Sequence, residues 1–147
     1  MPVNIYMNFN GDCRDAVEYY ANVFGVPTPD IMTFGEGPSE PGFEMPEEMK
    51  NLVMHARINL YGSDVMFSDS MPGSPVTFGN NLNMTVVTTD LEKMKTDFEK
   101  LAKDGEVRIP LEKTFWSAAY GAIKDKFGIE WQFSYDDGSE MNFDVNE

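Results

Sequence analysis

The sequence contains almost no cysteine. Its only one, Cys13, cannot form a disulfide within the chain, and a single thiol cannot build a cysteine-based metal site. A catalytic thiolate needs a nearby base, and the only histidine, His55, lies far along the sequence. Cys13 is therefore interpreted as a residue in the first turn of a helix, with nucleophilic catalysis as the alternative.

Positive charge is also scarce. The chain of 147 residues has 11 lysines and arginines against 25 aspartates and glutamates, which gives a formal net charge of −14. Such a chain repels nucleic-acid phosphates and anionic membranes, and its basic residues are dispersed rather than clustered. These features predict a protein that binds neither nucleic acid nor membranes.

Long hydrophobic runs are missing as well. No segment approaches the roughly 20 apolar residues that span a bilayer, and residues 1–10 lack the basic flank and apolar stretch of a signal peptide. We therefore expect a cytoplasmic location. With 41% hydrophobic residues, a chain of this size is expected to form one domain, without a disulfide or structural metal.

Alternating and helical hydrophobic patterns divide the first half into elements. A loop rich in Gly, Pro and Glu extends to Pro46, and residues 61–64 form a hairpin turn. The expected elements are a strand over residues 4–9, a helix capped by Asp12 and ended by Gly25, a short strand over 31–34, and strands over 54–60 and 65–68.

The second half repeats this pattern. Its expected elements are a strand over 82–86, a helix from Asp90 to Gly105, and strands over 106–115, 118–124 and 129–135. The halves align on Met7 with Met84, Asp12 with Asp90, Tyr20 with Phe98, and hairpin 61–68 with 127–134. Neither β-α-β-β-β half could bury its apolar sheet face alone, so the halves are expected to share a structure. The alternative is a chance likeness between two short patterns.

These elements predict an α+β fold in a single domain over residues 1–147. Its two units cover approximately residues 1–70 and 80–136, joined by a linker over 71–79. An acidic tail over 137–147, within the acidic stretch that begins at Asp136, is expected to fray.

Particular residues carry a family resemblance. They are Asn8 to Tyr20 with Phe24-Gly25, Met54 to Arg57 with Ser68-Asp69, and Phe115-Trp116, Tyr120-Gly121, Asp125, Phe127-Gly128 and Trp131-Gln132. In this combination the chain resembles the PhnB-like branch of the glyoxalase/bleomycin-resistance/dioxygenase (vicinal oxygen chelate) superfamily. The resemblance implies that the two units form a curled mixed sheet around a cavity, and that the protein is a homodimer. Some proteins of this branch are labelled as demethylubiquinone methyltransferases, but the sequence has no glycine-rich nucleotide loop or methyl-donor motif.

The resemblance also directs attention to a metal site. Metal-dependent members place His or Glu on the first and last strand of each unit, and the repeat maps these positions to Tyr6, Met66, Asn83 and Gln132. None is a histidine or a carboxylate, and amide or phenol oxygens are weak ligands alone. We therefore expect no metal and no cofactor, which puts isomerase or dioxygenase chemistry in doubt.

Strand alternation assigns two faces to the sheet. Facing the helices we expect Ile5, Met7, Phe9, Val65, Phe67, Leu82, Met84, Val86, Trp131 and Phe133. The opposite face would carry Tyr6, Asn8, His55, Arg57, Asn59, Met66, Asn83, Thr85, Gln132 and Ser134. That face either meets solvent, as is common in antiparallel sheets, or, if the sheet curls, lines a polar pocket.

Two groups on the chain suit ligand binding. His55 has an unperturbed pKa near neutrality and suits acid–base chemistry, although it could equally bond a neighbouring strand or loop. Phe115, Trp116 and Tyr120 either wall a pocket for an apolar or planar ligand or fill the core. The predicted ligand-binding residues are Tyr6, Asn8, His55, Asn83, Phe115, Trp116, Tyr120 and Gln132.

Three functions are compatible with these residues. The first is a metal-free small-molecule-binding protein, for example of a sequestering or resistance type, with an unknown ligand. The second is an enzyme of the superfamily that uses His55, with Asp69 as its candidate partner, on a small substrate. The third is a dimeric protein without a small ligand. The lack of a histidine or carboxylate at the four mapped positions favours the first over the second.

Overall fold

The computed structural model describes residues 3–37, 41–42 and 44–138. The chain divides into two compact units, Met1–Thr77 and Phe78–Glu147, at a point inside the predicted linker. Most of the predicted acidic tail, residues 139–147, lies outside the described residues. Among the described residues, every helix is too short or too polar to cross a bilayer.

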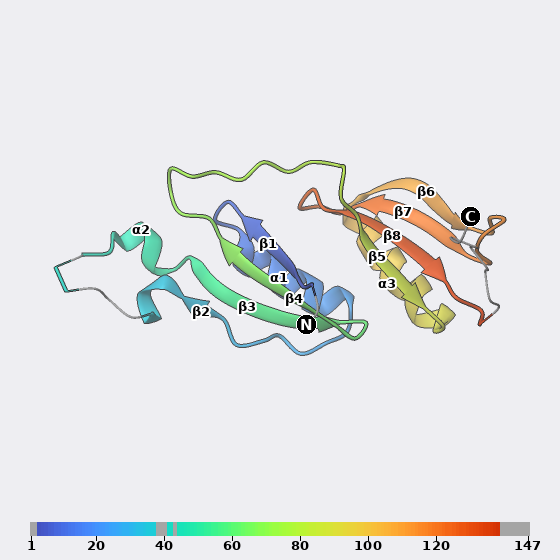
Figure 1. Ribbon diagram of the computed structural model, residues 1–147, viewed down its shortest axis with the longest axis horizontal. Helices are drawn as coiled ribbons and strands as arrows, with labels where there is room; N and C mark the ends of the chain where they lie inside the picture. The colour runs from blue at the N-terminus through green and yellow to red at the C-terminus, as the bar shows by residue number, and fades with distance from the viewer. Residues whose placement is uncertain (1–2, 38–40, 43, 139–147) are drawn as a thin grey trace. The chain divides into compact units, whose positions relative to one another are not determined.

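The first unit holds one helix against one face of a four-stranded mixed sheet (Figure 1). The strand order is β1-β4-β3-β2, and the pair of β1 and β4 is parallel. Its elements are β1 (Ile5–Phe9), α1 (Cys13–Val23), β2 (Met32–Thr33), a 3-10 turn η1 (Phe34–Glu36), a short α2 (Glu47–Lys50), β3 (Val53–Leu60) and β4 (Ser63–Asp69).

The second unit repeats the same order. Its strands run β5-β8-β7-β6, again with a parallel first and last pair, β5 with β8. Its elements are β5 (Met84–Thr88), α3 (Leu91–Asp104), β6 (Glu106–Glu112), β7 (Tyr120–Lys124) and β8 (Glu130–Tyr135). The predicted α+β fold of two tandem β-α-β-β-β units is confirmed, whereas the curled sheet around a cavity stays a prediction.

Each core lies between the helix and the helix-facing side of its sheet. Met7, Phe9, Val65, Phe67, Val86, Trp131 and Phe133 are all buried there, as predicted, and Met84 is partly buried. A fully buried side chain of this size contributes about 1.5–3 kcal/mol through the hydrophobic effect. One expectation was wrong, since Leu82 is 81% exposed because β5 begins only at Met84. Ile5 keeps the predicted face, paired with the buried Val65, but it is 42% exposed at the start of the edge strand β1.

The strand register corrects the alignment of the two halves. Met7 pairs with Phe67, and the residue that pairs with the equivalent Phe133 is Val86, not Met84. The methionine match was therefore wrong by two residues. The connection from strand to helix is one residue shorter in the second unit than in the first, so strand and helix cannot be aligned with one constant offset. A shift of two residues keeps each side chain on the same face, so the assignment of faces was preserved.

The two long helices begin in different ways. Asp90 caps α3 as predicted, since its Oδ1 accepts a hydrogen bond from the Lys93 N–H at 3.0 Å. Asp12 makes no such bond, so its predicted capping role was wrong. The Asp69 Oδ1, at the end of β4, instead accepts from the N–H groups of Gly11 and Cys13 at 2.9 and 3.0 Å.

Three smaller features differ from the predictions or refine them. The strand expected over residues 31–34 shrinks to Met32–Thr33 and is followed by η1, and α2 was not predicted. Cys13 is buried at the start of α1, and burial, together with the nearby carboxylates of Asp69 and Asp12, raises the pKa of its thiol well above the usual range. This environment disfavours the thiolate that nucleophilic catalysis requires.

Candidate ligand-binding surfaces

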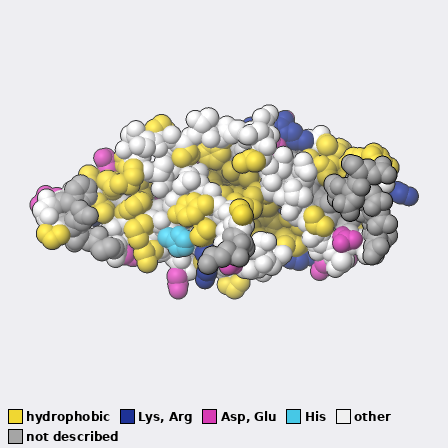
Figure 2. All heavy atoms as spheres, viewed as in Figure 1, with side chains coloured by type: hydrophobic (Ala, Val, Ile, Leu, Met, Phe, Trp, Pro, Cys, Tyr) yellow, Lys and Arg dark blue, Asp and Glu magenta, His cyan; other side chains and the backbone are white. Residues whose placement is uncertain are grey.

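The sheet face that points away from α1 brings three predicted site residues together. Tyr6 and Asn8 alternate on β1, and the Ser68 hydroxyl donates to the Asn8 Oδ1 at 3.1 Å. The ring centroids of Tyr6 and His55 lie 6.2 Å apart, and both side chains are exposed. Figure 2 shows the histidine at the surface beside hydrophobic side chains. We name this surface, defined by Tyr6, Asn8, His55 and Ser68, the first open face.

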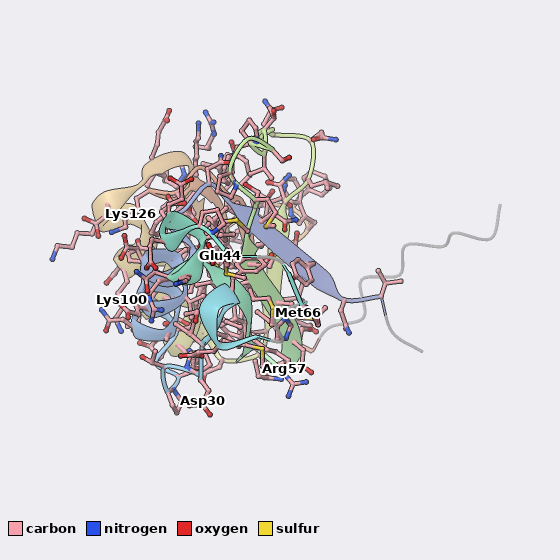
Figure 3. The ribbon with its side chains drawn as sticks, turned by 90° about the vertical axis from the view of Figure 1, so that its left-hand side faces the viewer. Asp30, Glu44, Arg57, Met66, Lys100 and Lys126 are labelled. Carbon is pink, nitrogen blue, oxygen red and sulfur yellow. The ribbon has the colours of Figure 1, made fainter. Side chains whose placement is uncertain are left out.

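Neighbouring side chains extend the first open face. Met66 and Arg57 are paired residues of β4 and β3, and Figure 3 shows them close to each other. Arg57 approaches Asp64 at 3.9 Å, a long contact between exposed groups that is worth little. The first open face therefore offers polar contacts across a broad surface.

Asp69, the predicted partner of His55, is occupied elsewhere. Its Oδ1 accepts the two N–H groups at the start of α1, and its Oδ2 accepts the Val53 N–H at 2.9 Å. The carboxylate is buried and ties the end of β4 to the beginnings of α1 and β3. Within the described part of the chain it shares no hydrogen bond or ion pair with His55. This geometry gives Asp69 a structural role.

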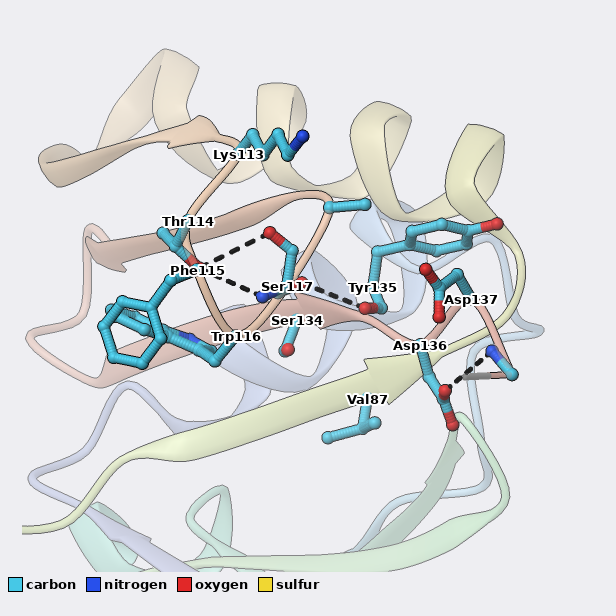
Figure 4. Close-up of a pocket in the computed structure, with 12 residues that line it drawn as sticks. Val87, Lys113, Thr114, Phe115, Trp116, Ser117, Ser134, Tyr135, Asp136 and Asp137 are labelled. Atoms are coloured by element: carbon cyan, nitrogen blue, oxygen red, sulfur yellow. Dashed lines mark hydrogen bonds between the residues drawn. The ribbon is translucent and has the colours of Figure 1, made fainter. Parts of the chain in front are cut away.

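A cavity of about 660 Å³ lies in the second unit, on the sheet face that points away from α3 (Figure 4). We name it the aromatic cavity. It is formed by the loop between β6 and β7, by β5 and by the end of β8. The lining residues are Val87, Lys113, Thr114, Phe115, Trp116, Ser117, Ala118, Ser134, Tyr135, Asp136, Asp137 and Gly138.

Aromatic side chains dominate one end of this cavity. Trp116 is partly buried, and its ring packs edge-on against Phe115, with centroids 4.6 Å apart, and against Tyr120 at 5.2 Å. Phe115 itself is 93% exposed. The three residues that the sequence singled out as a cluster thus do lie together, and two of them line the cavity.

Hydrogen bonds hold the loop that carries Phe115 and Trp116. The Thr114 N–H donates to the Ser117 carbonyl at 2.8 Å, and the Ser117 N–H donates to the Thr114 hydroxyl at 3.1 Å. The Ser117 hydroxyl in turn lies within hydrogen-bond distance of the carbonyls of Ala119 and Tyr135, at 2.8 and 2.9 Å. Because the loop is tied to β7 and β8, the aromatic pair is positioned before any ligand arrives.

The other end of the aromatic cavity carries charge that the sequence interpretation missed. The Asp136 N–H donates to the Thr88 carbonyl at 2.8 Å, and its Oδ1 accepts the Gly138 N–H at 2.9 Å. Asp136 had been assigned to a fraying acidic stretch. Its position directly after a strand of the sheet was the available signal that it lies beside the site. Lys113 and Asp137 are the other charged lining residues.

The remaining predicted site residues lie apart from the cavity lining. Gln132 is on the same face of β8 as Ser134, and it pairs with Thr85. Asn83 precedes β5 and is exposed, so its predicted place on that strand was wrong. The register therefore puts Thr85, rather than Asn83, at the position equivalent to Tyr6. No group of three or more His, Cys, Asp or Glu side chains among the described residues is arranged to hold a metal ion.

Two units of this topology define a fold class. The fosfomycin resistance protein FosX from Listeria monocytogenes shares the fold with a TM-score of 0.56, over 91% of this chain and 89% of FosX. At 9% identity this likeness concerns the fold alone. The chain thus shares the fold of this fosfomycin resistance protein.

A family model identifies a narrower group of proteins than the fold does. A family model described as 3-demethylubiquinone-9 3-methyltransferase matches residues 2–134, and the chain belongs to this family. Protein YjdN of Escherichia coli (strain K12) is 29% identical over 143 residues, which cover 91% of this chain and 95% of YjdN. The predicted resemblance to the PhnB-like branch is confirmed.

Two solved structures support the same assignment. Protein PA1353 from Pseudomonas aeruginosa has a TM-score of 0.79 at 29% identity and covers 92% of this chain and 98% of its own. A PhnB protein from Bacillus cereus, described as a putative 3-demethylubiquinone-9 3-methyltransferase, has a TM-score of 0.70 at 27% identity, over 92% of this chain and all of its own.

Proposed function

We propose that the protein binds a small organic molecule without a metal, and that the ligand lies in the aromatic cavity. The observation that carries this proposal is the tethered loop that presents a partly buried Trp116 and an almost fully exposed Phe115 to a cavity of about 660 Å³. A cavity of this size suits a small ligand. Holding an exposed phenylalanine at an ordered loop tip has a hydrophobic cost that a bound apolar group would offset.

Substitution of Trp116 tests the site. Trp116→Ala is expected to weaken binding of a planar probe such as 1-pyrenemethanol by about 1–3 kcal/mol, the scale of losing a packed aromatic anchor. Tyr6→Ala removes an aromatic ring from the first open face and serves as the matched control. Isothermal titration should show normal affinity for Tyr6→Ala. Normal affinity for Trp116→Ala together with weakened binding in Tyr6→Ala would indicate that the ligand binds at the first open face instead.

An enzyme that uses His55 is the second candidate. The observation in its favour is the polar first open face, where His55 lies beside Tyr6 and near Asn8. Thermal-shift measurements with nickel, zinc and iron distinguish the candidates, because a ligand of the native state raises the unfolding midpoint. A clear shift with a metal would favour the enzyme, and a shift with planar organic compounds alone would favour the binding protein.

Methyl transfer, the reaction in the family's name, is not what we propose. A nucleotide-like methyl donor binds well where a glycine-rich turn leads from a strand into a helix. Here the connections that lead from a strand into a long helix, α1 or α3, are residues 10–12 and 89–90, and of these two only the first contains a glycine, Gly11. Neither provides such a turn.

We also propose that the protein is a homodimer. Residues 70–89 contain no charged side chain, in a chain whose net charge is −14, and they include the edge strand β5 with its exposed Val87. A second, equally acidic copy can approach such an uncharged edge with little repulsion. Light scattering at micromolar concentration should give twice the monomer mass of 16.6 kDa. A particle of the monomer mass would contradict the proposal.

A further inference from the structure

We infer that the ligand of the aromatic cavity is an organic cation with a flat apolar portion. Its ring would lie against Phe115 and Trp116, and its positive charge would lie at Asp136 and Asp137. This inference rests on the proposed function, because it names the chemical class of a ligand for the same cavity.

The cavity has two chemically different ends. Figure 4 shows Phe115 and Trp116 at one end and Asp136 and Asp137 at the other, with the Ser134 side chain between them. A ligand that fills the cavity therefore meets aromatic rings and carboxylates at the same time. A flat molecule with a cationic substituent matches both.

The acidic end is held in place by the backbone. The hydrogen bond from the Asp136 N–H to the Thr88 carbonyl, at 2.8 Å, fixes the residue beside the end of β5. The contact from the Gly138 N–H to the Asp136 Oδ1, at 2.9 Å, orients the carboxylate. A carboxylate that is oriented in advance loses little freedom when it binds a cation.

The balance of charge favours a cation over an anion. Two carboxylates and one ammonium group, that of Lys113, line the cavity. The net charge of −14 adds a negative field around the whole chain, which attracts cations and repels anions.

Three probes with one ring system and different charges test the inference. They are 1-pyrenemethylamine as its ammonium ion, neutral 1-pyrenemethanol and anionic 1-pyrenecarboxylate. We expect the ammonium probe to bind about 2–5 times more tightly than the alcohol, as expected for an exposed ion pair, and the carboxylate to bind most weakly. The advantage of the ammonium probe should shrink as the salt concentration rises.

Variants that change the charge of single lining residues test which of them cause the tighter binding of the ammonium probe. Asp136→Asn keeps the oxygen that accepts the Gly138 N–H and should remove most of the preference for the ammonium probe, with no change for the alcohol. Lys113→Gln should strengthen binding of the ammonium probe. Glu99→Gln, an exposed position on α3 across the sheet from the cavity, is the matched control and should change nothing.

The outcomes separate this inference from the proposed function. Equal binding of all three probes, all lost in Trp116→Ala, would overturn the cationic ligand and support the cavity as a site. Tightest binding of the carboxylate would overturn it too and would make Lys113 the anchor. A failure of every probe to bind would count against both the cavity and the inference.

Discussion

The two units of this protein have the same strand order and the same parallel pairing, yet their open faces differ. In the first unit the face beside His55 carries both polar and hydrophobic side chains, with a hydrogen bond from the Ser68 hydroxyl to the Asn8 Oδ1. In the second unit the corresponding face is hollowed, and Trp116 borders the hollow. The sheets alone do not explain this difference, since their topology repeats.

The difference arises in the connections between strands. The second unit joins β6 to β7 by the loop over residues 113–119, which folds back through Ser117 onto β8 and carries the aromatic pair. The first unit joins β2 to β3 by a longer segment that contains η1 and α2. The repeat thus supplies the scaffold, and the candidate site comes from a loop that only one unit has.

The largest expected difference in stability is between alanine variants of the two tryptophans. Trp131 is buried in the core of the second unit, and its Nε1–H donates to the Asp125 Oδ2 at 2.8 Å. Trp131→Ala should lower the free energy of unfolding by about 3–5 kcal/mol, because it leaves a cavity and removes the indole N–H that donates to the Asp125 Oδ2. Urea denaturation measures this, with Trp116→Ala as the control that stays within about 1 kcal/mol.

Asp69 gives the next largest effect and concerns the first unit. Asp69→Ala leaves the N–H groups of Gly11, Cys13 and Val53 without their acceptor. Each orphaned buried donor costs about 1–3 kcal/mol, and partial access of water to Gly11 reduces the sum, so we expect a loss of about 3 kcal/mol. Urea denaturation that shows a loss below about 1 kcal/mol would contradict the structural role of Asp69.

In the second unit, Asp90 stabilises the start of α3 with a single hydrogen bond. Asp90→Ala removes the acceptor for the Lys93 N–H and should cost about 1 kcal/mol, the usual value for a helix cap. Asp90→Asn retains a capping oxygen and should recover most of that loss in thermal unfolding. An effect as large as that of Asp69→Ala would show that the two helix starts are not as different as their hydrogen bonds indicate.

His55 gives the smallest effect on stability. Its side chain is exposed on the first open face, so His55→Ala should change the free energy of unfolding by less than about 0.5 kcal/mol. Thermal unfolding of His55→Ala and of Trp131→Ala, measured under the same conditions, compares the two effects on stability. Unfolding of the histidine variant, with a harmless tryptophan variant, would invert the assignment of the two sheet faces.

Much of the fold followed from hydrophobic periodicity. The repeat, the β-α-β-β-β order within each unit and the two faces were predicted correctly because period-2 alternation specifies which side of a strand is buried. The short elements η1 and α2 were not predicted. The start of β5 was not, since the apolar Leu82 continues the alternation without lying in the strand. The cap of α1 was missed because its acceptor, Asp69, is distant in sequence, and only the folded sheet brings it near Cys13.

The candidate site was predicted less completely. The aromatic cluster of Phe115, Trp116 and Tyr120 was visible as a composition feature, and the structure brings it together. The acidic end was not recognised, because Asp136 resembles the start of a solvated acidic tail when read along the chain. Its bond to the Thr88 carbonyl depends on the pairing of β5 with β8, which periodicity alone does not specify.

The most direct test of the central claim uses the indole signals of the two tryptophans. In ¹H–¹⁵N spectra, titration with 1-pyrenemethylamine should shift the Trp116 indole N–H and leave that of Trp131, buried against Asp125, unchanged. Backbone signals of residues 113–118 and 134–138 should move with Trp116. Shifts confined to Tyr6, Asn8 and His55, or shifts of Trp131 with Trp116 unchanged, would contradict a ligand site in the aromatic cavity.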